Sequence, residues 1–188
     1  MPRSGKIVRD RLQQAALELF IEHGFDQTTT ERIAARAGVT ERTYFRHFAD
    51  KREVLFGGEA ELREELAQAL AAIPRQVEPL PALKDAFHGV VPLLVRNRPI
   101  AKLRARVIGV TPALQEREVA KAAALVTLIA DALEARGVDA RTAQLFGQVG
   151  TSICVVAMKR WMDDSSEGLD AEIERAFHEL REASKALA

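Results

Sequence analysis

The side chains with the clearest chemical potential lie close together between residues 40 and 46. Thr40, Glu41, Arg42, Thr43 and Arg46 bring hydroxyl, carboxylate and guanidinium groups into one short segment. Such groups donate to and accept from base edges and phosphates in the major groove of DNA. The four histidines are scattered and no H-E-x-x-H motif occurs, so the sequence predicts no metal site, no catalytic group and no cofactor.

Two short helices are needed to position these side chains. Threonine capping can start the first helix at Thr28 or Thr29, and Gly38 supplies a left-handed turn after it. The second helix begins near Thr40, with Val39 filling the turn. Tyr44 and Phe48 can pack back against the first helix, so the segment is predicted to be a helix-turn-helix whose second helix is the reader.

The rest of the chain repeats apolar residues at helical spacing, interrupted by Gly and Pro. No strand pattern is present, and the fold class expected is all-α with about nine helices. The two short helices follow a first helix at 4–23. The later helices are expected at 51–73, 80–97, 99–109, 112–136, 139–163 and 169–188, with Pro92 kinking the one that contains it.

The N-terminal segment also resembles the tetracycline-repressor (TetR) family over about residues 5–56. The matching positions are Gly24-Phe25, Thr28-Thr29, Ile33-Ala34, Ala37-Gly38-Val39-Thr40, Phe45, His47-Phe48 and Lys51. Two positions depart from the family pattern: Phe45 stands where a tyrosine is common, and the acidic capping residue Glu31 comes one place early, with Arg32 in its stead.

The resemblance implies roles for individual residues of this segment. Thr40 to Thr43 would face bases, whereas Phe45, His47 and Lys51 occupy positions that usually touch phosphates. The DNA-binding residues expected are Thr30, Arg32, Thr40, Glu41, Arg42, Thr43, Tyr44, Phe45, Arg46, His47 and Lys51. Solvated surface charge is the alternative for the arginines, and a surface histidine is the alternative for His47.

The resemblance also implies two domains, a helix-turn-helix DNA-binding domain at 1–50 and a helical ligand-binding and dimerisation domain at 51–188. An effector pocket is expected between the fifth and eighth helices, lined by Phe87, Val91, Leu94, Val107, Leu125 and Leu128. Solid core is the alternative for each of these residues. The cations Arg96, Arg98, Lys102, Arg104 and Arg106 could receive the anionic head of an amphiphile or simply form a solvated face.

The last two helices are predicted to form the dimer surface. Small residues at helical spacing allow close helix approach, and apolar residues of the last helix continue the surface. The residues expected are Ala143, Gly147, Gly150, Cys154, Ala157, Ile173, Phe177 and Leu180. Two such helices from each subunit would give a four-helix bundle, and an intramolecular core is the alternative.

The charge balance favours local over bulk attraction to DNA. The 188 residues carry 27 Lys and Arg against 27 Asp and Glu, which excludes a histone-like protein. No secretory signal or membrane span is apparent, and a single cysteine fits a reducing cytoplasm. We therefore expect a cytoplasmic homodimer that binds a double-stranded DNA operator and is released by a small apolar or amphipathic effector. A helical enzyme and a helical adaptor that does not bind DNA are the alternatives.

Overall fold

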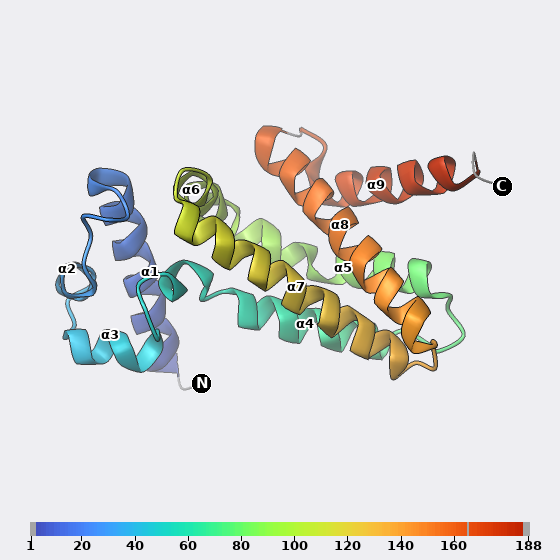
Figure 1. Cartoon of the computed structure of the whole chain (residues 1–188), viewed down its shortest axis with the longest axis horizontal. Coiled ribbons are helices and arrows are strands. Elements are labelled where there is room, and N and C mark those ends of the chain that lie inside the picture. Colours follow the sequence, from blue (N-terminus) through green and yellow to red (C-terminus); the bar gives the residue numbers. More distant parts are fainter. Residues whose placement is uncertain (1–2, 165, 186–188) are drawn as a thin grey trace. The chain divides into compact units, whose positions relative to one another are not determined.

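The computed structural model describes residues 3–164 and 166–185, and every regular element within them is helical (Figure 1). The all-α prediction is therefore confirmed for this part of the chain. The α-helices are α1 (Arg3–His23), α2 (Thr30–Arg36), α3 (Glu41–His47), α4 (Glu59–Ala72), α5 (Pro79–Arg96), α6 (Arg98–Gly109), α7 (Pro112–Glu134), α8 (Ala140–Asp164) and α9 (Gly168–Lys185). Pro92 lies within α5 without ending it.

The single helix expected at 51–73 is instead two elements. The 3₁₀-helix η1 (Glu53–Phe56) comes first, then Gly57-Gly58, then α4. Val54, Leu55 and Phe56 are all buried, and three consecutive buried residues do not fit one face of an α-helix. Two adjacent glycines also disfavour helix continuation. The prediction failed because apolar spacing alone does not distinguish a tight turn from a helix start.

The chain packs as two compact units, each formed by two stretches of sequence. The first contains residues 1–60 and 99–119, and the second contains residues 61–98 and 120–188. The packing boundary thus differs from the domain boundary expected at residue 50, because residues 51–60 and 99–119 pack with the N-terminal helices. The assignment of DNA binding and ligand binding to separate parts of the chain stays a prediction.

The core of the first unit joins α1, α2, α3 and η1 to α6 and the start of α7. Leu12, Ile33 and Tyr44 are fully buried in it, and Val107, Ile108 and Leu114 join the same cluster. Polar contacts reinforce this packing. Arg117 at the start of α7 pairs with Glu53 of η1, and the Arg104 guanidinium lies 5.9 Å from the centre of the Phe56 ring.

The core of the second unit lies among α4, α5, α7, α8 and α9. The rings of Phe87 of α5 and Phe177 of α9 pack at a tilt of 46° with their centroids 6.2 Å apart, and Leu70, Ile129 and Leu133 are fully buried. At the rim of the α5 and α9 contact, the two ring nitrogens of His88 lie 2.7 Å from Asp170 and 3.0 Å from Glu174. The two ends of the His88 ring therefore tie α5 to successive turns of α9.

Candidate nucleic-acid interface

Helix α2 and the turn after it form the scaffold of the predicted helix-turn-helix. The Thr29 hydroxyl accepts a hydrogen bond from Arg32 N at 3.2 Å, which caps the start of α2. Gly38 then adopts φ +66°, a conformation that glycine tolerates best. Val39 N donates to Ala34 O at 2.9 Å and closes the turn. These contacts confirm that the segment is a helix-turn-helix.

The side chain of Arg11 fixes this turn from α1. Its Nη2 donates to the carbonyl of Ala37, and a Cβ atom at Gly38 would lie only 2.7 Å from the same nitrogen. The turn therefore needs glycine for its φ angle, and a larger residue would also displace the end of the Arg11 side chain from its place beside the turn. Sequence reasoning missed Arg11, because its partner is a backbone atom 26 positions away.

Helix α3 begins with a second threonine cap. The Thr40 hydroxyl accepts from Thr43 N at 3.3 Å and lies 3.1 Å from the Thr43 hydroxyl. Thr30 of α2 donates to the Glu41 carboxylate and so links the first turns of the two helices. Two hydrogen-bonded pairs, Thr40 with Thr43 and Thr30 with Glu41, thus lie at the N-termini of α2 and α3.

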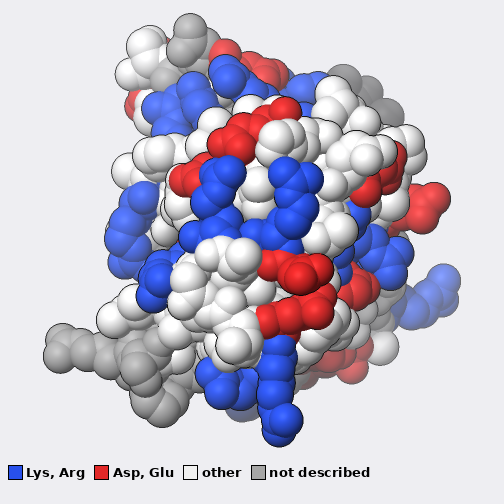
Figure 2. All heavy atoms as spheres, turned by 90° about the vertical axis from the view of Figure 1, so that its left-hand side faces the viewer, with Lys and Arg blue, Asp and Glu red and all other residues white. Residues whose placement is uncertain are grey.

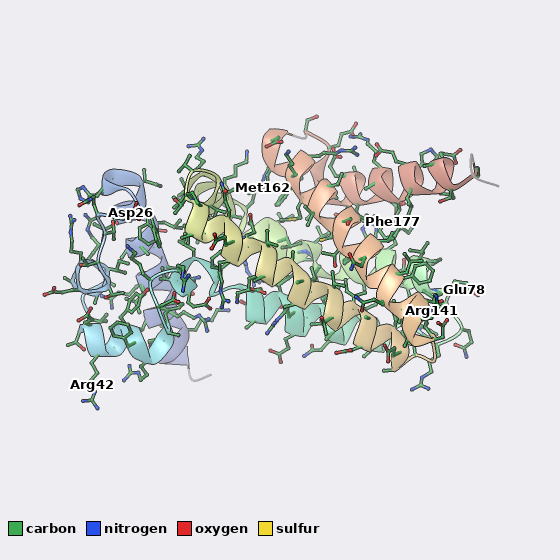
Figure 3. All side chains as sticks on the ribbon, viewed as in Figure 1. Asp26, Arg42, Glu78, Arg141, Met162 and Phe177 are labelled. Carbon is green, nitrogen blue, oxygen red and sulfur yellow. The ribbon has the colours of Figure 1, made fainter. Side chains whose placement is uncertain are left out.

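The exposed face of α3 carries Arg42, Phe45 and Arg46. The Arg42 side chain extends away from the helix (Figure 3). Within the described part of the chain, Arg42 and Arg46 have no hydrogen-bond or ion-pair partner. Phe45 is 51% exposed although it is a large aromatic residue. Figure 2 shows Lys and Arg side chains spread over this end of the N-terminal unit with acidic side chains between them. Unpaired guanidinium groups on an exposed helix face are suited to bind phosphate oxygens, and the Phe45 ring beside them can make only apolar contacts.

Tyr44 requires a correction among the expected DNA contacts. It is fully buried, and its hydroxyl donates to Asp50 O at 3.0 Å. Burial, together with the nearby carboxylates of Asp50 and Glu53, raises the pKa of the Tyr44 hydroxyl well above its ordinary value. Tyr44 therefore positions α3 from inside the unit and does not reach a ligand outside it.

Lys51 also has structural partners. Its Nζ donates to Phe25 O at 2.7 Å and to Thr28 O at 2.9 Å, and it lies 4.1 Å from the centre of the Phe25 ring. Desolvation by burial lowers the pKa of Lys51, and Asp26 acts in the opposite direction. Two of its three N–H donors thus hold the loop before α2, which leaves one donor for a phosphate.

His47 stands at the end of α3 beside Arg46. Desolvation by burial lowers the pKa of His47, and the charges of Arg46 and Arg9 lower it further. A phosphate contact from His47 at neutral pH would therefore come from a neutral ring N–H. Arg32, the remaining predicted contact, is exposed in α2 and donates through Nη1 to Gln27 O at 3.2 Å.

The structure brings five of the six expected pocket residues to one hydrophobic core, and the sixth lies elsewhere. Phe87 and Val91 are buried in the core of the second unit, and Leu94, Leu125 and Leu128 pack against that core. Val107 lies in the core of the first unit. Phe87, Val91 and Val107 are thus enclosed by core side chains, and a role for any of the six residues in effector binding stays a prediction.

A groove runs along the surface between α4 and α7 and has a volume of about 640 Å³. Its floor is made of small or apolar side chains, and one cation, one anion and one hydroxyl stand along it. The lining residues are Arg63 and Ala67 of α4 with Ala124, Thr127, Leu128, Asp131 and Ala132 of α7. Only Leu128 belongs to the predicted pocket, because a run of alanines in the sequence does not show whether the helices touch or leave a groove.

The small-residue stripe of α8 requires a second correction. Ala143 and Ala157 are fully buried within the single chain. A Cβ atom at Gly147 would lie 2.7 Å from Val126 O of α7, and one at Gly150 would lie 3.0 Å from Leu83 Cδ1 of α5. This stripe therefore packs inside the subunit, which was the alternative reading, and does not form the surface of α8. In α9, Ile173 is also buried.

Other predicted residues of this surface are only partly covered. Cys154, Phe177 and Leu180 are half-buried against the same core. Burial raises the pKa of the Cys154 thiol to about 11. The exposed apolar residues of α8 lie on the opposite face, where Leu145, Val155 and Val156 have 58%, 53% and 41% of their area exposed.

The run of cations in α5 and α6 is divided among separate contacts. Arg98 donates to Trp161 O at 2.7 Å and lies 4.6 Å above the Trp161 ring, whereas Arg104 is held in the first unit. Desolvation by burial lowers the pKa of Arg104, although the negative charges of Glu118 and Glu59 act to raise it. A single anion-binding cluster made of all five cations is therefore not formed.

Metal-binding clusters and membrane-spanning helices are absent from the described residues. These residues contain no group of three or more His, Cys, Asp or Glu side chains arranged to hold a metal ion. No helix among them has both the length and the apolarity needed to cross a bilayer.

Family models match most of the chain. The model described as bacterial regulatory proteins, tetR family, matches residues 12–57, which contain the helix-turn-helix. The model described as the MftR C-terminal domain matches residues 77–185, more than half of the chain.

Individual relatives agree with both matches. The HTH-type transcriptional regulator TcmR of Streptomyces glaucescens is 42% identical over 83 residues, which cover 44% of this chain and 37% of TcmR. A Mycobacterium tuberculosis protein named as the mycofactocin biosynthesis transcriptional regulator MftR is 27% identical over 187 residues, or 94% of each chain. Among solved structures, Thermus thermophilus FadR in complex with lauroyl-CoA is 24% identical with a TM-score of 0.55, over 90% of this chain and 91% of FadR.

Proposed function

We infer, from the premise that the chain belongs to the TetR family of bacterial regulatory proteins, that α3 is the recognition helix that reads an operator in double-stranded DNA. The single observation that carries this proposal is the exposed, unpaired face of α3, held by a buried Tyr44 and capped by Thr40. A rigid helix whose Arg42 and Arg46 have no internal partners can enter the major groove with the donors of both guanidinium groups available to DNA.

The contacts of α3 divide into two kinds. Arg42, with Glu41 and Thr43 beside it, reads base edges, and the guanidinium group can bind a guanine through two hydrogen bonds. Phe45, Arg46 and His47 contact the phosphate backbone, where they fix the register of the helix. Thr30 and Arg32 approach the backbone from the start of α2, and Lys51 contributes its one remaining donor.

A homodimer supplies the second reader. We assign its interface to the exposed face of α8 that contains Leu145, Gln148, Ser152 and Val155, whose spacing of three or four residues makes one continuous stripe. The exposed apolar area at Leu145, Val155 and Val156 supports this choice, because large exposed aliphatic side chains on one helix face are typical of association surfaces. Half-buried Phe177 and Leu180 of α9 extend the apolar region.

The effector binds in the groove between α4 and α7. The alanine and leucine floor suits an apolar body, and Arg63, Thr127 and Asp131 offer polar contacts along it. Arg63 and Asp131 have no ion-pair partner within the described residues, so both are free to bind a ligand. We propose that a mainly apolar or amphipathic small molecule separates α4 from α7 and lowers the affinity for the operator, as expected of a cytoplasmic repressor.

Selection of bound duplexes from a random DNA library tests the DNA-binding proposal. The expected result is an enriched site with two half-sites whose centres lie about 34 Å apart, or a multiple of this. Binding should weaken steeply with added salt. Failure to retain any duplex at low salt would contradict the proposal and favour the adaptor.

A linkage experiment tests the effector proposal separately. Lauroyl-CoA, which the FadR structure contains, is an amphiphile of the expected class and serves as the first trial ligand, with triclosan as a smaller one. If a ligand weakens operator binding by ~5–150-fold, the operator must weaken binding of that ligand by the same factor. Equal ligand affinities with and without the selected operator would refute the coupling and leave the DNA-binding proposal intact.

A further inference from the structure

Arg136 makes an unusual set of contacts in the turn after α7. Its Nη1 donates to Leu70 O at 3.2 Å and to Ile73 O at 2.6 Å, and its Nη2 donates to Pro74 O at 2.9 Å and to Val77 O at 3.1 Å. One guanidinium group thus binds four carbonyl oxygens of the segment that ends α4 and begins the connector to α5.

The position of these carbonyls explains why the contact matters. The last carbonyls of a helix have no partner within the helix, and Pro74 prevents the chain from continuing as one. From the turn after α7, Arg136 supplies a donor to Leu70 O in the last turn of α4 and binds three carbonyls of the residues that follow the helix. The C-terminal end of α4 is therefore fastened to the end of α7 by a charged, planar group that fits several acceptors at once.

Toward its other end α4 is held by side-chain contacts: Leu66 packs in the core of the second unit, and Glu61 pairs with Arg96 of α5 at 3.5 Å. Along the middle of α4 the surface groove separates Arg63 and Ala67 from Ala124 and Thr127 of α7. The helix runs from Glu59 to Ala72, so its length is about 20 Å. In sequence it follows η1 and the helix-turn-helix directly. Hydrogen bonds to backbone carbonyls fix one end of α4, whereas the rest of the helix is held by side-chain contacts beside a groove, so a rotation of α4 would be centred on the fastened end.

We propose that Arg136 is a positioning residue that fixes the pivot of α4. This inference rests on the proposed function. When an effector separates α4 from α7, the fastened end stays in place, so α4 rotates and the recognition helix α3 is displaced. A rotation of about 10° over the ~20 Å length moves the N-terminal end of α4 by ~3–4 Å. Without the hydrogen bonds of Arg136, α4 shifts as a whole, and α3 then adopts a range of orientations.

The first test measures the position of α4 within the second unit. Spin labels are placed at exposed Glu64 of α4 and Gln144 of α8, with Cys154→Ala in every protein, and the distance distribution is recorded by pulsed electron resonance. We expect Arg136→Ala to widen the distribution at least twofold and Arg136→Lys to give an intermediate width, because lysine reaches fewer of the four carbonyls. The matched control is Arg75→Ala, since Arg75 is an exposed cation of the same connector with no hydrogen-bond partner among the described residues. An unchanged width in Arg136→Ala would overturn the proposal.

The second test uses the duplex that the wild-type protein selects from the random library. If the binding-competent orientation falls to about one tenth of the population, the apparent Kd rises about tenfold. Affinity is expressed per folded protein, so a loss of stability alone does not change it. A wider distribution with unchanged affinity would show that Arg136 only supports the fold and would overturn its positioning role. If no duplex is selected, the proposed function fails, whereas the distance measurement still decides whether Arg136 fastens α4.

Discussion

Lys51→Met distinguishes a structural role of this lysine from a role in phosphate binding. The substitution keeps much of the aliphatic stem and removes the two hydrogen bonds to Phe25 O and Thr28 O and the cation over the Phe25 ring. We take about 1 kcal/mol for each hydrogen bond, because water can reach these partly buried carbonyls, and about 0.5–1 kcal/mol for the cation–π contact. The free energy of unfolding should therefore fall by about 2–3 kcal/mol.

Urea denaturation followed by far-ultraviolet circular dichroism measures this loss. Arg46→Met is the matched control, since Arg46 is exposed and unpaired within the described residues, and its stability should stay within about 0.5 kcal/mol of the wild type. Hydrogen exchange at residues 24–30 should increase in Lys51→Met and not in Arg46→Met. Two results together would show that our structural assignment of Lys51 is wrong. Lys51→Met would unfold at the same urea concentration as the wild type, and the slope of log K against log salt concentration for DNA binding would become shallower by about one unit.

Three further predictions follow from other contacts. Arg42→Ala should cost ~1–3 kcal/mol on the selected duplex and relax the preference at one base pair, as measured by competition with single-base variants; an equal loss on random DNA would refute base reading. Val155→Arg should give a folded monomer in sedimentation, whereas Gly150→Arg should unfold the second unit, because Leu83 already occupies the space beside Gly150. If Gly150→Arg instead gave a folded monomer, the small-residue stripe of α8 would form the dimer interface after all. Since the pKa of His47 is lowered, the unfolded chain binds more protons near the ordinary histidine pKa, so stability should fall as the pH drops through about 6.5, and His47→Gln should reduce this dependence.

The helix-turn-helix was predictable because its determinants are local. Thr29, Gly38 and Thr40 act on backbone within a few positions of themselves, and each has a turn or cap role that its residue type indicates. Long-range contacts leave no comparable signal. Arg11 and Arg136 bind carbonyl oxygens, which every residue has, so no pattern of side chains marks their partners.

The wrong expectations share a different physical cause. Periodicity shows that a helix face is buried but not what buries it. Gly147 and Gly150 were assigned to a second subunit, although α7 and α5 of the same chain cover them. Val107 was likewise assigned to the pocket, although its helix packs with the N-terminal core. Tyr44 illustrates the reverse case, since its neighbours in sequence face outward while its own side chain is enclosed.

The discontinuous make-up of the first unit limits how its reader can be transferred to another protein. A hybrid regulator that takes only residues 1–60 would leave behind Val107, Ile108 and Leu114, which pack in the same core as Phe56. It would also lose the Arg117 partner of Glu53. Exchange of operator specificity between related regulators should therefore carry residues 99–119 together with 1–60, so that the grafted reader keeps the buried surface on which its own helices rest.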